Sequence, residues 1–537
     1  SKIIMGKIFL FLRTISYLKF RQIAFRIFYS LRHKYRRFVR FKLNYNFYRK
    51  GKPLFFDAFI PNKTSYISNT FTFLNQSITF SDGVDWDYMD NGKLWAYNLN
   101  YFDFLNQPSL EKEIGEALIF LFIDQIRDLK NANEPYPTSL RGINWIKFFS
   151  THEIEKKSFD RYLYSQYRIL LDQIEYHLLG NHLLENGFSL FFGGYYFKGL
   201  ELYQKGKELI SIELREQILN DGAHFELSPM YHKIILSRVL DAYNLSKNNK
   251  DVYEDASFEQ FLKETAQKML GWLEKVTFSD GTTPRVNDST EGISSESAEL
   301  FDYAKRLGLK WGIAVLSDSG YRLFKSDEVE LFVDYGKIGP GYIPGHAHSD
   351  TFSFILNFKG RPLIVDPGIS TYNTGYRRQR ERSTSSHNTV RYGKVDQSEV
   401  WGGFRVGRRA KAVITEESNT GIKGYHNGYK RFGVYHQRVF NFDQTSITIE
   451  DNMVAKNQLL GKSSAYFHFY PGIEVGIEQN RILVDGCDLK FSGASSTRIK
   501  EYVYAHGYND TEKAKLVEVI FEERLVTSIT LNGFKDN

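Results

Sequence analysis

Four short segments of this 537-residue chain carry side chains that could exchange protons or bind a charged ligand. In GNHLLENG, Asn181, His182 and Glu185 stand where a helix is expected to begin. In ELSPMYHK, Ser228 is a natural helix N-cap and the proline after it suits the first helical position. Tyr231 then falls in the first turn, where the helix dipole favours the ionised phenolate. Taken alone, a capping Asn and a packed Tyr are the simpler interpretations.

The other two segments supply histidines and a carboxylate. GPGYIPGHAHSDTFSF holds His346 and His348, whose rings would point the same way in an extended chain. LIVDPGISTYNTGYRRQRERSTSSHNTV places Asp366 at a strand end and His387 further on. His348, Asp366 and His387 together form a plausible metal-ligand set of two imidazoles and one carboxylate. Their spacing alone also allows ordinary loop residues satisfied by protein partners.

Positive charge gathers in the same part of the chain. Eight arginines stand between residues 377 and 409, among them Arg378, Arg382 and Arg405. The chain has 70 Lys and Arg and 63 Asp and Glu, but the first fifty residues hold 14 cations and no acid, which leaves the rest net negative. A cationic cluster on an acidic body favours recognition of carboxylate or sulfate. A solvated basic face is the alternative.

Two kinds of secondary structure must position these residues. From about residue 105 to 310, apolar residues recur at helical spacing, as at Leu110, Ile114, Leu118 and Leu121. After about residue 312, short runs such as FSFILNF alternate as strands do. A helical part followed by a strand part predicts two domains. We expect the helical domain over residues 51–310 and antiparallel strands over residues 311–537.

Residues 1–50 are predicted to form basic, aromatic helices. They could pack on the body with solvated basic faces, or make peripheral contact with an anionic membrane. No apolar run approaches the roughly 20 residues of a membrane span, and no signal peptide is visible. A cytoplasmic or membrane-peripheral location is therefore favoured, with a periplasmic one if a signal was removed before Ser1. Nucleic acid is not an expected partner.

Composition narrows the function classes further. Hydrophobic residues at 42% and charged residues at 25% are typical of a soluble globular protein. The single cysteine, Cys487, excludes an internal disulfide and any site built from several thiolates. The aromatic share of 16% suits a groove that holds sugar rings, and Tyr136 and Trp145 are expected to bind substrate with the arginines.

The order of the motifs resembles the heparinase II/III family of polysaccharide lyases and its alginate-lyase-like relatives. The resemblance rests on NHxxEN, SPMYH, GHAHSDTFSF, LIVDPG and RSTSSHNTV, and extends through LWAYNLNYFDFL, YPTSLRGINWI and PRVNDS over about residues 90 to 415. It implies an incomplete α/α toroid followed by an antiparallel β-sandwich. It also implies β-elimination on a uronic-acid-containing polysaccharide, whether heparin- or heparan-like, alginate-like, or a bacterial capsule or exopolysaccharide.

The resemblance assigns a role to each candidate residue. Asn181 and His182 match the pair that neutralises the uronate carboxylate. Tyr231 matches the tyrosine that protonates the leaving oxygen and, for one stereochemistry at C5, also removes the proton. His346 matches the base for the other stereochemistry, and Glu185 is expected to orient a catalytic ring.

The resemblance also implies one structural zinc ion on His348, Asp366 and His387, with no organic cofactor. Two other classes of function stay open. One is a catalytically silent glycan-binding or assembly protein of polysaccharide biosynthesis, because the fold alone does not fix the function. The other is a glycan hydrolase that uses a metal on the same three residues.

Overall fold

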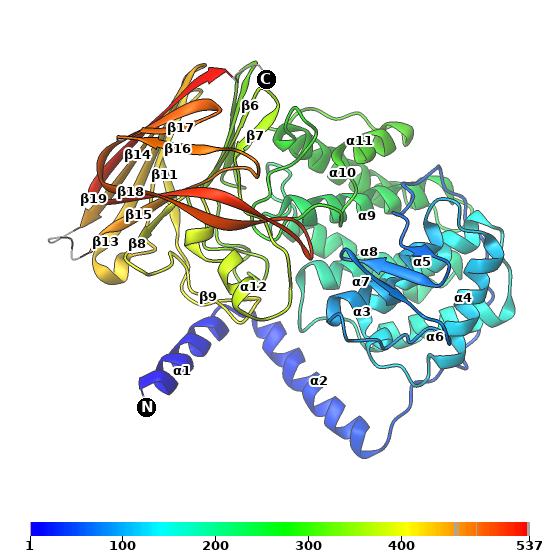
Figure 1. Cartoon of the computed structure of the whole chain (residues 1–537). Helices are drawn as coiled ribbons and strands as arrows, with labels where there is room; N and C mark the ends of the chain where they lie inside the picture. Colours follow the sequence, from blue (N-terminus) through cyan, green and yellow to red (C-terminus); the bar gives the residue numbers. More distant parts are fainter. Residues whose placement is uncertain (1, 456–458, 460, 480, 534–537) are drawn as a thin grey trace.

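The chain is helical up to residue 306 and dominated by strands from residue 321 onward (Figure 1). The computed structural model describes residues 2–455, 459, 461–479 and 481–533. The predicted order, helices and then antiparallel strands, is confirmed. The last helix before the sheets ends at Arg306 and the first strand after it begins at Tyr321, on either side of the predicted domain boundary.

Most helices belong to the N-terminal half, where Ser228 caps α9 and a proline begins α5 and α9, as those residue types favour. The helices are α1 (Lys2–Ile15), α2 (Phe20–Phe38), α3 (Lys93–Tyr101), α4 (Lys112–Gln125), α5 (Pro135–Thr151), α6 (Lys157–Asp172), α7 (Gly180–Tyr196), α8 (Leu200–Gln217), α9 (Pro229–Asn248), α10 (Ala256–Val276), α11 (Ser297–Arg306) and α12 (Tyr376–Glu381). Short 3-10 turns cover Asp103–Asn106, Asn131–Asn133, Thr384–Ser386 and Lys430–Phe432.

Helix α7 lies at the centre of the helical domain. Nearly all of its residues are buried, and it packs against both α5 and α8. Gly187 makes this close packing possible, because a Cβ there would lie 2.9 Å from the side chain of Leu209 on α8. The N-terminal end of α7, which carries Asn181 and His182, is therefore held on a rigid support.

The strands form two large antiparallel sheets and two small ones. A four-stranded sheet has the order β4-β5-β6-β7, and a ten-stranded sheet follows β11-β12-β13-β14-β19-β18-β17-β16, with β15 joining β19 to β8. The strands are β1 (Tyr66–Ile67), β2 (Thr70–Phe73), β3 (Gln76–Thr79), β4 (Tyr321–Lys325), β5 (Val329–Asp334), β6 (Phe354–Phe358), β7 (Arg361–Ile364), β8 (Val390–Tyr392), β9 (Val400–Trp401), β10 (Arg405–Val406), β11 (Ala412–Ser418), β12 (Gly421–His426), β13 (Val434–Phe442), β14 (Ser446–Ala455), β15 (Ser463–His468), β16 (Val475–Glu478), β17 (Arg481–Val484), β18 (Gly486–Gly507) and β19 (Asp510–Gly533). Inward-facing side chains of both large sheets share one hydrophobic core.

The long hairpin of β18 and β19 reaches from the sheets to the helical half of the chain (Figure 1). Its tip meets the turn between β2 and β3. Asn75 donates a hydrogen bond of 2.9 Å to the carbonyl oxygen of Tyr508, and Asn509 donates one of 2.9 Å to the carbonyl oxygen of Leu74. The two hairpin tips thus join parts of the chain more than 430 residues apart.

Helices α1 and α2 project from the body on one side (Figure 1). Arg13 of α1 forms an ion pair with Glu399 at 2.9 Å, and Arg32 and Arg36 of α2 bind Asp172. No helix in the described part of the chain combines the length and the apolarity that a membrane crossing requires.

Candidate active site

Tyr231 and His346 lie face to face, although they come from different domains. Tyr231 stands in the first turn of α9, and His346 stands in the loop between β5 and β6. Their ring centroids are 4.0 Å apart and the ring planes differ by 13°. Both side chains are half-buried, so they remain accessible to a ligand. Two groups capable of proton transfer thus lie side by side.

Glu226 orients the ring of His346. The Nδ1 atom of His346 is hydrogen-bonded to a carboxylate oxygen of Glu226, which is itself buried. Burial acts to raise the pKa of Glu226, but the charge of His346 and this hydrogen bond outweigh it, so the pKa is lowered. An ionised carboxylate can only accept, so Nδ1 carries the proton. The Nε2 atom of His346 is then the basic nitrogen.

The hydroxyl of Tyr231 belongs to a group of tyrosines. It lies 3.0 Å from the hydroxyl of Tyr372, whose ring packs edge-on against Tyr508. Burial, together with the nearby Tyr508, raises the pKa of Tyr231 well above its usual value. The expectation that the helix dipole favours a phenolate is therefore wrong, because loss of hydration outweighs the dipole here. Tyr231 rests as a neutral phenol, ready to donate a proton.

Asn181 and His182 stand at the first turn of α7, beside the same site. The Nδ1 atom of His182 lies 3.0 Å from a carboxylate oxygen of Glu175, and its ring packs on Tyr136 at 4.2 Å. Burial acts to lower the pKa of His182, but the charge and hydrogen bond of Glu175 outweigh it and raise the pKa. The Asn181 amide has no hydrogen-bond partner among the described residues. The pair offers a cation and free amide donors.

The backbone before α7 brings this pair close to His346. Leu179 and Gly180 both have positive φ values, of 64° and 60°. A Cβ on Gly180 would lie 2.7 Å from Ile343, in the loop that carries His346, and 3.6 Å from Glu226. A larger residue at position 180 would therefore have to displace the side chain of Ile343, in a backbone conformation that favours glycine. Strained conformations of this kind persist where surrounding structure enforces them.

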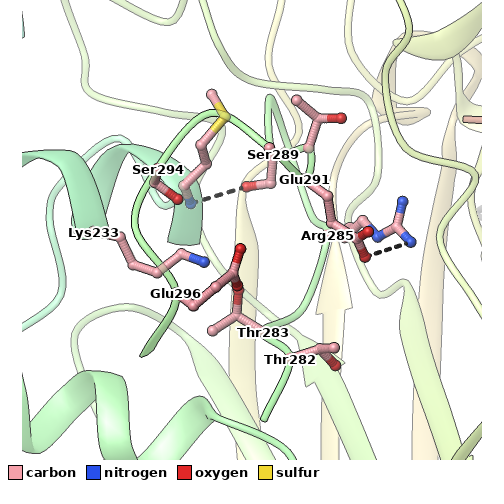
Figure 2. A pocket seen from close by; sticks show the side chains of 11 residues that line it. Lys233, Thr282, Thr283, Arg285, Ser289, Glu291, Ser294 and Glu296 are labelled. Atoms are coloured by element: carbon pink, nitrogen blue, oxygen red, sulfur yellow. Dashed lines mark hydrogen bonds and ion pairs between the residues drawn. The ribbon is translucent and has the colours of Figure 1, made fainter. Parts of the chain in front are cut away.

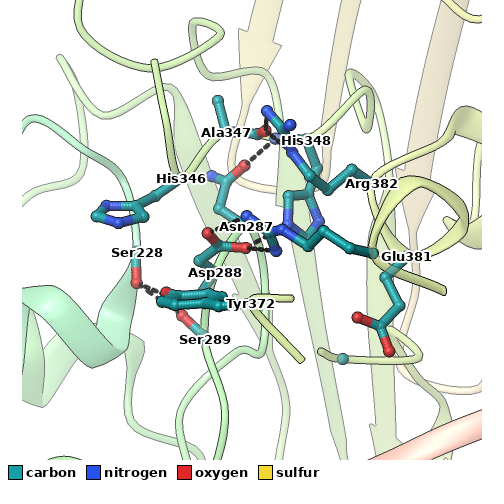
Figure 3. A network of polar contacts seen from close by, with 12 residues as sticks. Ser228, Asn287, Asp288, Ser289, His346, Ala347, His348, Tyr372, Glu381 and Arg382 are labelled. Atoms are coloured by element: carbon teal, nitrogen blue, oxygen red, sulfur yellow. Dashed lines mark hydrogen bonds and ion pairs between the residues drawn. The ribbon is translucent and has the colours of Figure 1, made fainter. Parts of the chain in front are cut away.

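Residues 287–289 hold the two halves of the site in register (Figure 3). The backbone carbonyl oxygen of Asp288 accepts a hydrogen bond from the Ser228 hydroxyl at 2.7 Å. The backbone N–H of Asp288 donates to the carbonyl oxygen of His346 at 3.0 Å. The Ser289 hydroxyl lies 3.0 Å from that of Ser228, and Asn287 accepts from the backbone N–H of His348 at 3.0 Å. One short segment thus fixes the start of α9 against the histidine loop.

The predicted role of Glu185 is not what the structure shows. Both carboxylate oxygens of Glu185 bind Nε of Arg238, at 3.2 and 3.0 Å, deep inside the helical domain. Burial raises its pKa even though Arg238 opposes the shift. Glu226 and Glu175 instead bind the rings of His346 and His182, and Glu185 anchors α7 to α9.

Three of the five predicted substrate-binding residues are structural. Arg378 is fully buried and forms a two-pronged ion pair with Asp288, at 2.5 and 2.6 Å. Arg382 is also fully buried and donates to backbone carbonyl oxygens, including that of Ala347. Trp145 lies in the core of the helical domain. These side chains cannot reach a polysaccharide without unfolding.

The other two predicted substrate-binding residues remain open to a ligand. Tyr136 is half-buried and covers the ring of His182. Arg405 is exposed, and its guanidinium lies over the ring of Trp401, 4.7 Å from the centroid.

His348, Asp366 and His387 come together in the sheet half, but only two of them offer free donor atoms. The Nδ1 atom of His348 and the Nε2 atom of His387 are buried without a hydrogen-bond partner, and the ring centroids are 5.3 Å apart. Their other nitrogens bind Asp288 at 2.8 Å and Asp366 at 2.7 Å. Such carboxylate partners are usual behind metal-ligating histidines. Among the described residues, however, no three His, Cys, Asp or Glu side chains are grouped closely enough to hold a metal.

A separate cavity of about 210 Å³ lies beside the start of α9 (Figure 2). Met230 and Lys233 line it from one helix face, whereas Tyr231 points elsewhere. Burial lowers the pKa of Lys233, and among the other lining charges Arg285 and Glu291 pair at 2.9 Å, while Glu296 also lines the cavity. Most lining residues are polar or charged, and neither Tyr231 nor His346 is among them.

Several site residues were missed by sequence reasoning. Glu226 opens the ELSPMYHK segment and Asp288 stands in PRVNDS, so each had a signal in a motif already noted. Tyr372 also stands in a quoted segment, LIVDPGISTYNTGYRRQRERSTSSHNTV. Glu175 and Tyr508 had no such signal, because they lie outside every motif and reach the site only through the fold.

Two family models cover most of the chain. The model described as Heparinase II/III N-terminus matches residues 139–306, and the model described as Heparinase II/III-like, C-terminal matches residues 309–531. The chain is also similar to two heparin-sulfate lyases. It is 26% identical over 327 residues to the one from Bacteroides stercoris, covering 55% of this chain and 46% of the relative. It is 28% identical over 221 residues to the one from Pedobacter heparinus, covering 36% of this chain and 32% of the relative. The matches thus span about half the length of these relatives or less.

Solved structures show the same architecture. A heparinase III structure superposes with a TM-score of 0.63 at 16% identity, covering 85% of this chain and 81% of the other. The heparan sulfate lyase of Pedobacter heparinus superposes with a TM-score of 0.55 at 18% identity, covering 87% and 82%. The fold is therefore an α toroid followed by a β-sandwich.

Proposed function

The chain belongs to the heparinase II/III family, and from this premise we propose that it is a lyase that cleaves a uronic-acid-containing polysaccharide by β-elimination. The observation that carries the proposal is the pairing of Tyr231 with His346 across the two domains, at 4.0 Å between ring centroids. The names of the two curated relatives support a glycosaminoglycan-type substrate.

Neutralisation of the uronate carboxylate is the first requirement of this chemistry. The proton on C5 is only weakly acidic while the neighbouring carboxylate keeps its full charge, because its removal creates an enolate-like dianion. The raised pKa of His182 favours a cation beside the free amide of Asn181. Hydrogen bonds from these two groups would strengthen as negative charge develops in the transition state.

Proton transfer then falls to Tyr231 and His346. In the proposed reaction, a base removes the C5 proton, the electron pair forms the C4–C5 double bond, and the C4–O bond breaks. For one C5 epimer the Nε2 atom of His346 is the base, and Tyr231, a neutral phenol at rest, donates its proton to the departing oxygen. For the other epimer Tyr231 first loses its proton to solvent water, takes the C5 proton as the phenolate, and passes that proton to the departing oxygen. Such acid–base catalysis is worth roughly 10² to 10⁴ in rate.

Product analysis on a panel of polysaccharides tests this proposal. We expect at least one uronate polymer, heparan-like, alginate-like or capsular, to give an unsaturated uronate that absorbs ultraviolet light, and no neutral glucan to be cleaved. Running the reaction in ¹⁸O-labelled water separates lyase from hydrolase, because only a hydrolase places solvent oxygen at the cleaved bond. Cleavage with solvent oxygen and no unsaturated product would contradict β-elimination, and an intact panel would favour a binding protein.

We propose in addition that the free imidazole nitrogens of His348 and His387 hold a structural zinc ion, with Asp366 behind His387 as the carboxylate that orients its ring. The two unpartnered imidazole nitrogens support this, because buried polar atoms rarely lack a partner. The ion would supply a fixed link between the His346 loop and the loop that carries His387. Catalysis would run through the residues named above, and not through the metal.

Metal content and thermal stability test the zinc proposal. Purified protein should contain about one equivalent of zinc, and a chelator should lower its melting temperature, because the binding energy of a structural metal is also folding energy. His348→Ala should lose both the zinc and the response to chelator, whereas His506→Ala, at a surface histidine bound to Glu512, should keep both. Metal-free wild-type protein that does not respond to chelator would contradict the proposal.

A further inference from the structure

The outward face of α2 is an apolar stripe. The stripe consists of five residues at spacings of seven, four, four and three, which places them on one side of the helix: Phe20, Ile27, Leu31, Tyr35 and Phe38. All five are between 57% and 86% exposed. An ordinary surface helix turns such a stripe toward the core. Here the stripe faces away from the body.

The inward face of α2 contacts the helical domain through hydrogen bonds, ion pairs and the packing of Phe25 on Tyr176. Gln22 is buried and donates to the carbonyl oxygen of Leu178 at 3.2 Å, and the Tyr29 hydroxyl donates to the carbonyl oxygen of Ile174 at 2.5 Å. Arg32 and Arg36 bind Asp172. Because polar contacts fix this side, α2 cannot rotate to bury its stripe without breaking them.

Helix α1 repeats the arrangement. Ile8, Phe11 and Leu12 are each about half exposed, whereas Arg13 and Thr14 face the sheet half of the chain. Arg13 pairs with Glu399, and Trp401 donates to the Thr14 hydroxyl at 3.1 Å. Both helices therefore present exposed apolar side chains opposite the residues that bind the body.

The charge around the stripe indicates what covers it. Residues 1–50 contain 14 Lys and Arg and no Asp or Glu. Lys7, Lys34, Arg37 and Arg40 are exposed and form no ion pair within the described part of the chain. Apolar residues flanked by free cations match an interfacial helix on anionic lipid.

We propose that α1 and α2 are a docking surface for an anionic lipid bilayer, with the stripe in the interfacial layer and the free cations on lipid headgroups. A second copy of the chain fits less well, because it would bring two strongly cationic segments together. Nucleic acid would satisfy the cations but leave the apolar stripe in water. The proposal is independent of the lyase activity.

Flotation of the full chain with lipid vesicles tests this surface. Vesicles of phosphatidylcholine with one-third phosphatidylglycerol should bind the protein roughly tenfold or more tightly than phosphatidylcholine alone, and added salt should weaken the binding. Ile27→Ser/Leu31→Ser and Lys34→Glu/Arg37→Glu should each reduce binding roughly tenfold or more. The melting temperature should not change, because these side chains face solvent. Ile313→Ser/Val315→Ser, at exposed apolar residues elsewhere, should bind as the wild type does.

An added tryptophan gives a direct readout of insertion. Phe28→Trp, beside the stripe, should shift its fluorescence to shorter wavelength with anionic vesicles, measured as the difference from the wild type, which contains six tryptophans of its own. Equal binding to neutral vesicles, full binding by the stripe variant, or an unshifted probe on bound protein would each overturn the proposal. A different result would also overturn it: the wild type does not bind vesicles but forms a dimer as its concentration rises, and Ile27→Ser/Leu31→Ser abolishes that dimer.

Discussion

Replacing Tyr231 with Phe should lower turnover on the cleaved polymer by roughly 10² or more while leaving the fold intact. The substitution keeps the ring that packs on His346 at 4.0 Å and deletes only the hydroxyl, so the free energy of unfolding should change by no more than about 1 kcal/mol. The phenol is the proton donor for the departing oxygen, and it is neutral at rest because burial raises its pKa. Rates of unsaturated-product formation and melting temperatures check the expectation.

Tyr372→Phe is the matched control, because it removes the same atom from the neighbouring ring, 3.0 Å away. We expect a smaller loss there, since Tyr372 touches the acid and not the leaving oxygen. His346→Ala should lose most on the C5 epimer that Tyr231 cannot deprotonate. A fully active Tyr231→Phe protein would contradict the mechanism. Equal losses of turnover in Tyr231→Phe and Tyr372→Phe would mean that the two hydroxyls act together as the proton donor.

Asp288→Asn should lower the free energy of unfolding by about 3–5 kcal/mol, the usual cost of breaking a buried ion pair by removing one partner. Both Asp288 and Arg378 are fully buried, and the guanidinium binds both carboxylate oxygens, at 2.5 and 2.6 Å. Asn keeps the shape but leaves the charge of Arg378 uncompensated in the interior. Chemical denaturation with a two-state fit, or the melting temperature, measures the effect.

Asp302→Asn provides the comparison, because Asp302 forms an exposed pair with Lys305 at 3.8 Å. That variant should change stability by well under 1 kcal/mol, as exposed pairs usually do. Similar losses of stability from Asp288→Asn and Asp302→Asn would mean that the buried ion pair of Asp288 and Arg378 stabilises the fold no more than an exposed pair does. Residues 287–289 would then not be a firm link between α9 and the histidine loop.

The fold could be predicted well because its signal is local. Helical spacing and strand alternation in FSFILNF need only neighbouring residues, and the structure has α4 and β6 at these places. The predicted helix face was only partly right, because Leu110 precedes α4 and Ile114 and Leu121 are exposed, whereas Leu118 is buried. The small sheet of β1, β2 and β3 was not predicted. It lies within the expected helical domain, in strands of two to four residues.

The site was harder to predict because burial and pairing depend on distant residues. Arg378 and Arg382 stand in a run of arginines that suggests an exposed cationic patch, and only the fold shows their burial by Asp288 and by backbone carbonyls. Trp145 was assigned to a sugar groove, but α5 is buried from Pro137 to Phe149, so no side of it faces a ligand. Tyr231 and His346 were identified because each lies in a motif.

The meeting of the two hairpin tips bears on when the protein becomes active during its synthesis. The helical half leaves the ribosome first, and most of its large hydrophobic core comes from its own helices, although Trp272 and its neighbours pack against Tyr321 and Phe332 of the sheet half. Tyr508, beside Tyr372 at the site, arrives only with the β18–β19 hairpin, and that hairpin docks on Leu74 and Asn75 across more than 430 residues. Contacts of such sequence separation form late and slowly. A nascent chain should therefore hold Tyr231 on a folded helix before it can cleave a substrate. Cleavage should begin only once the tip of the β18–β19 hairpin has docked on the β2–β3 turn.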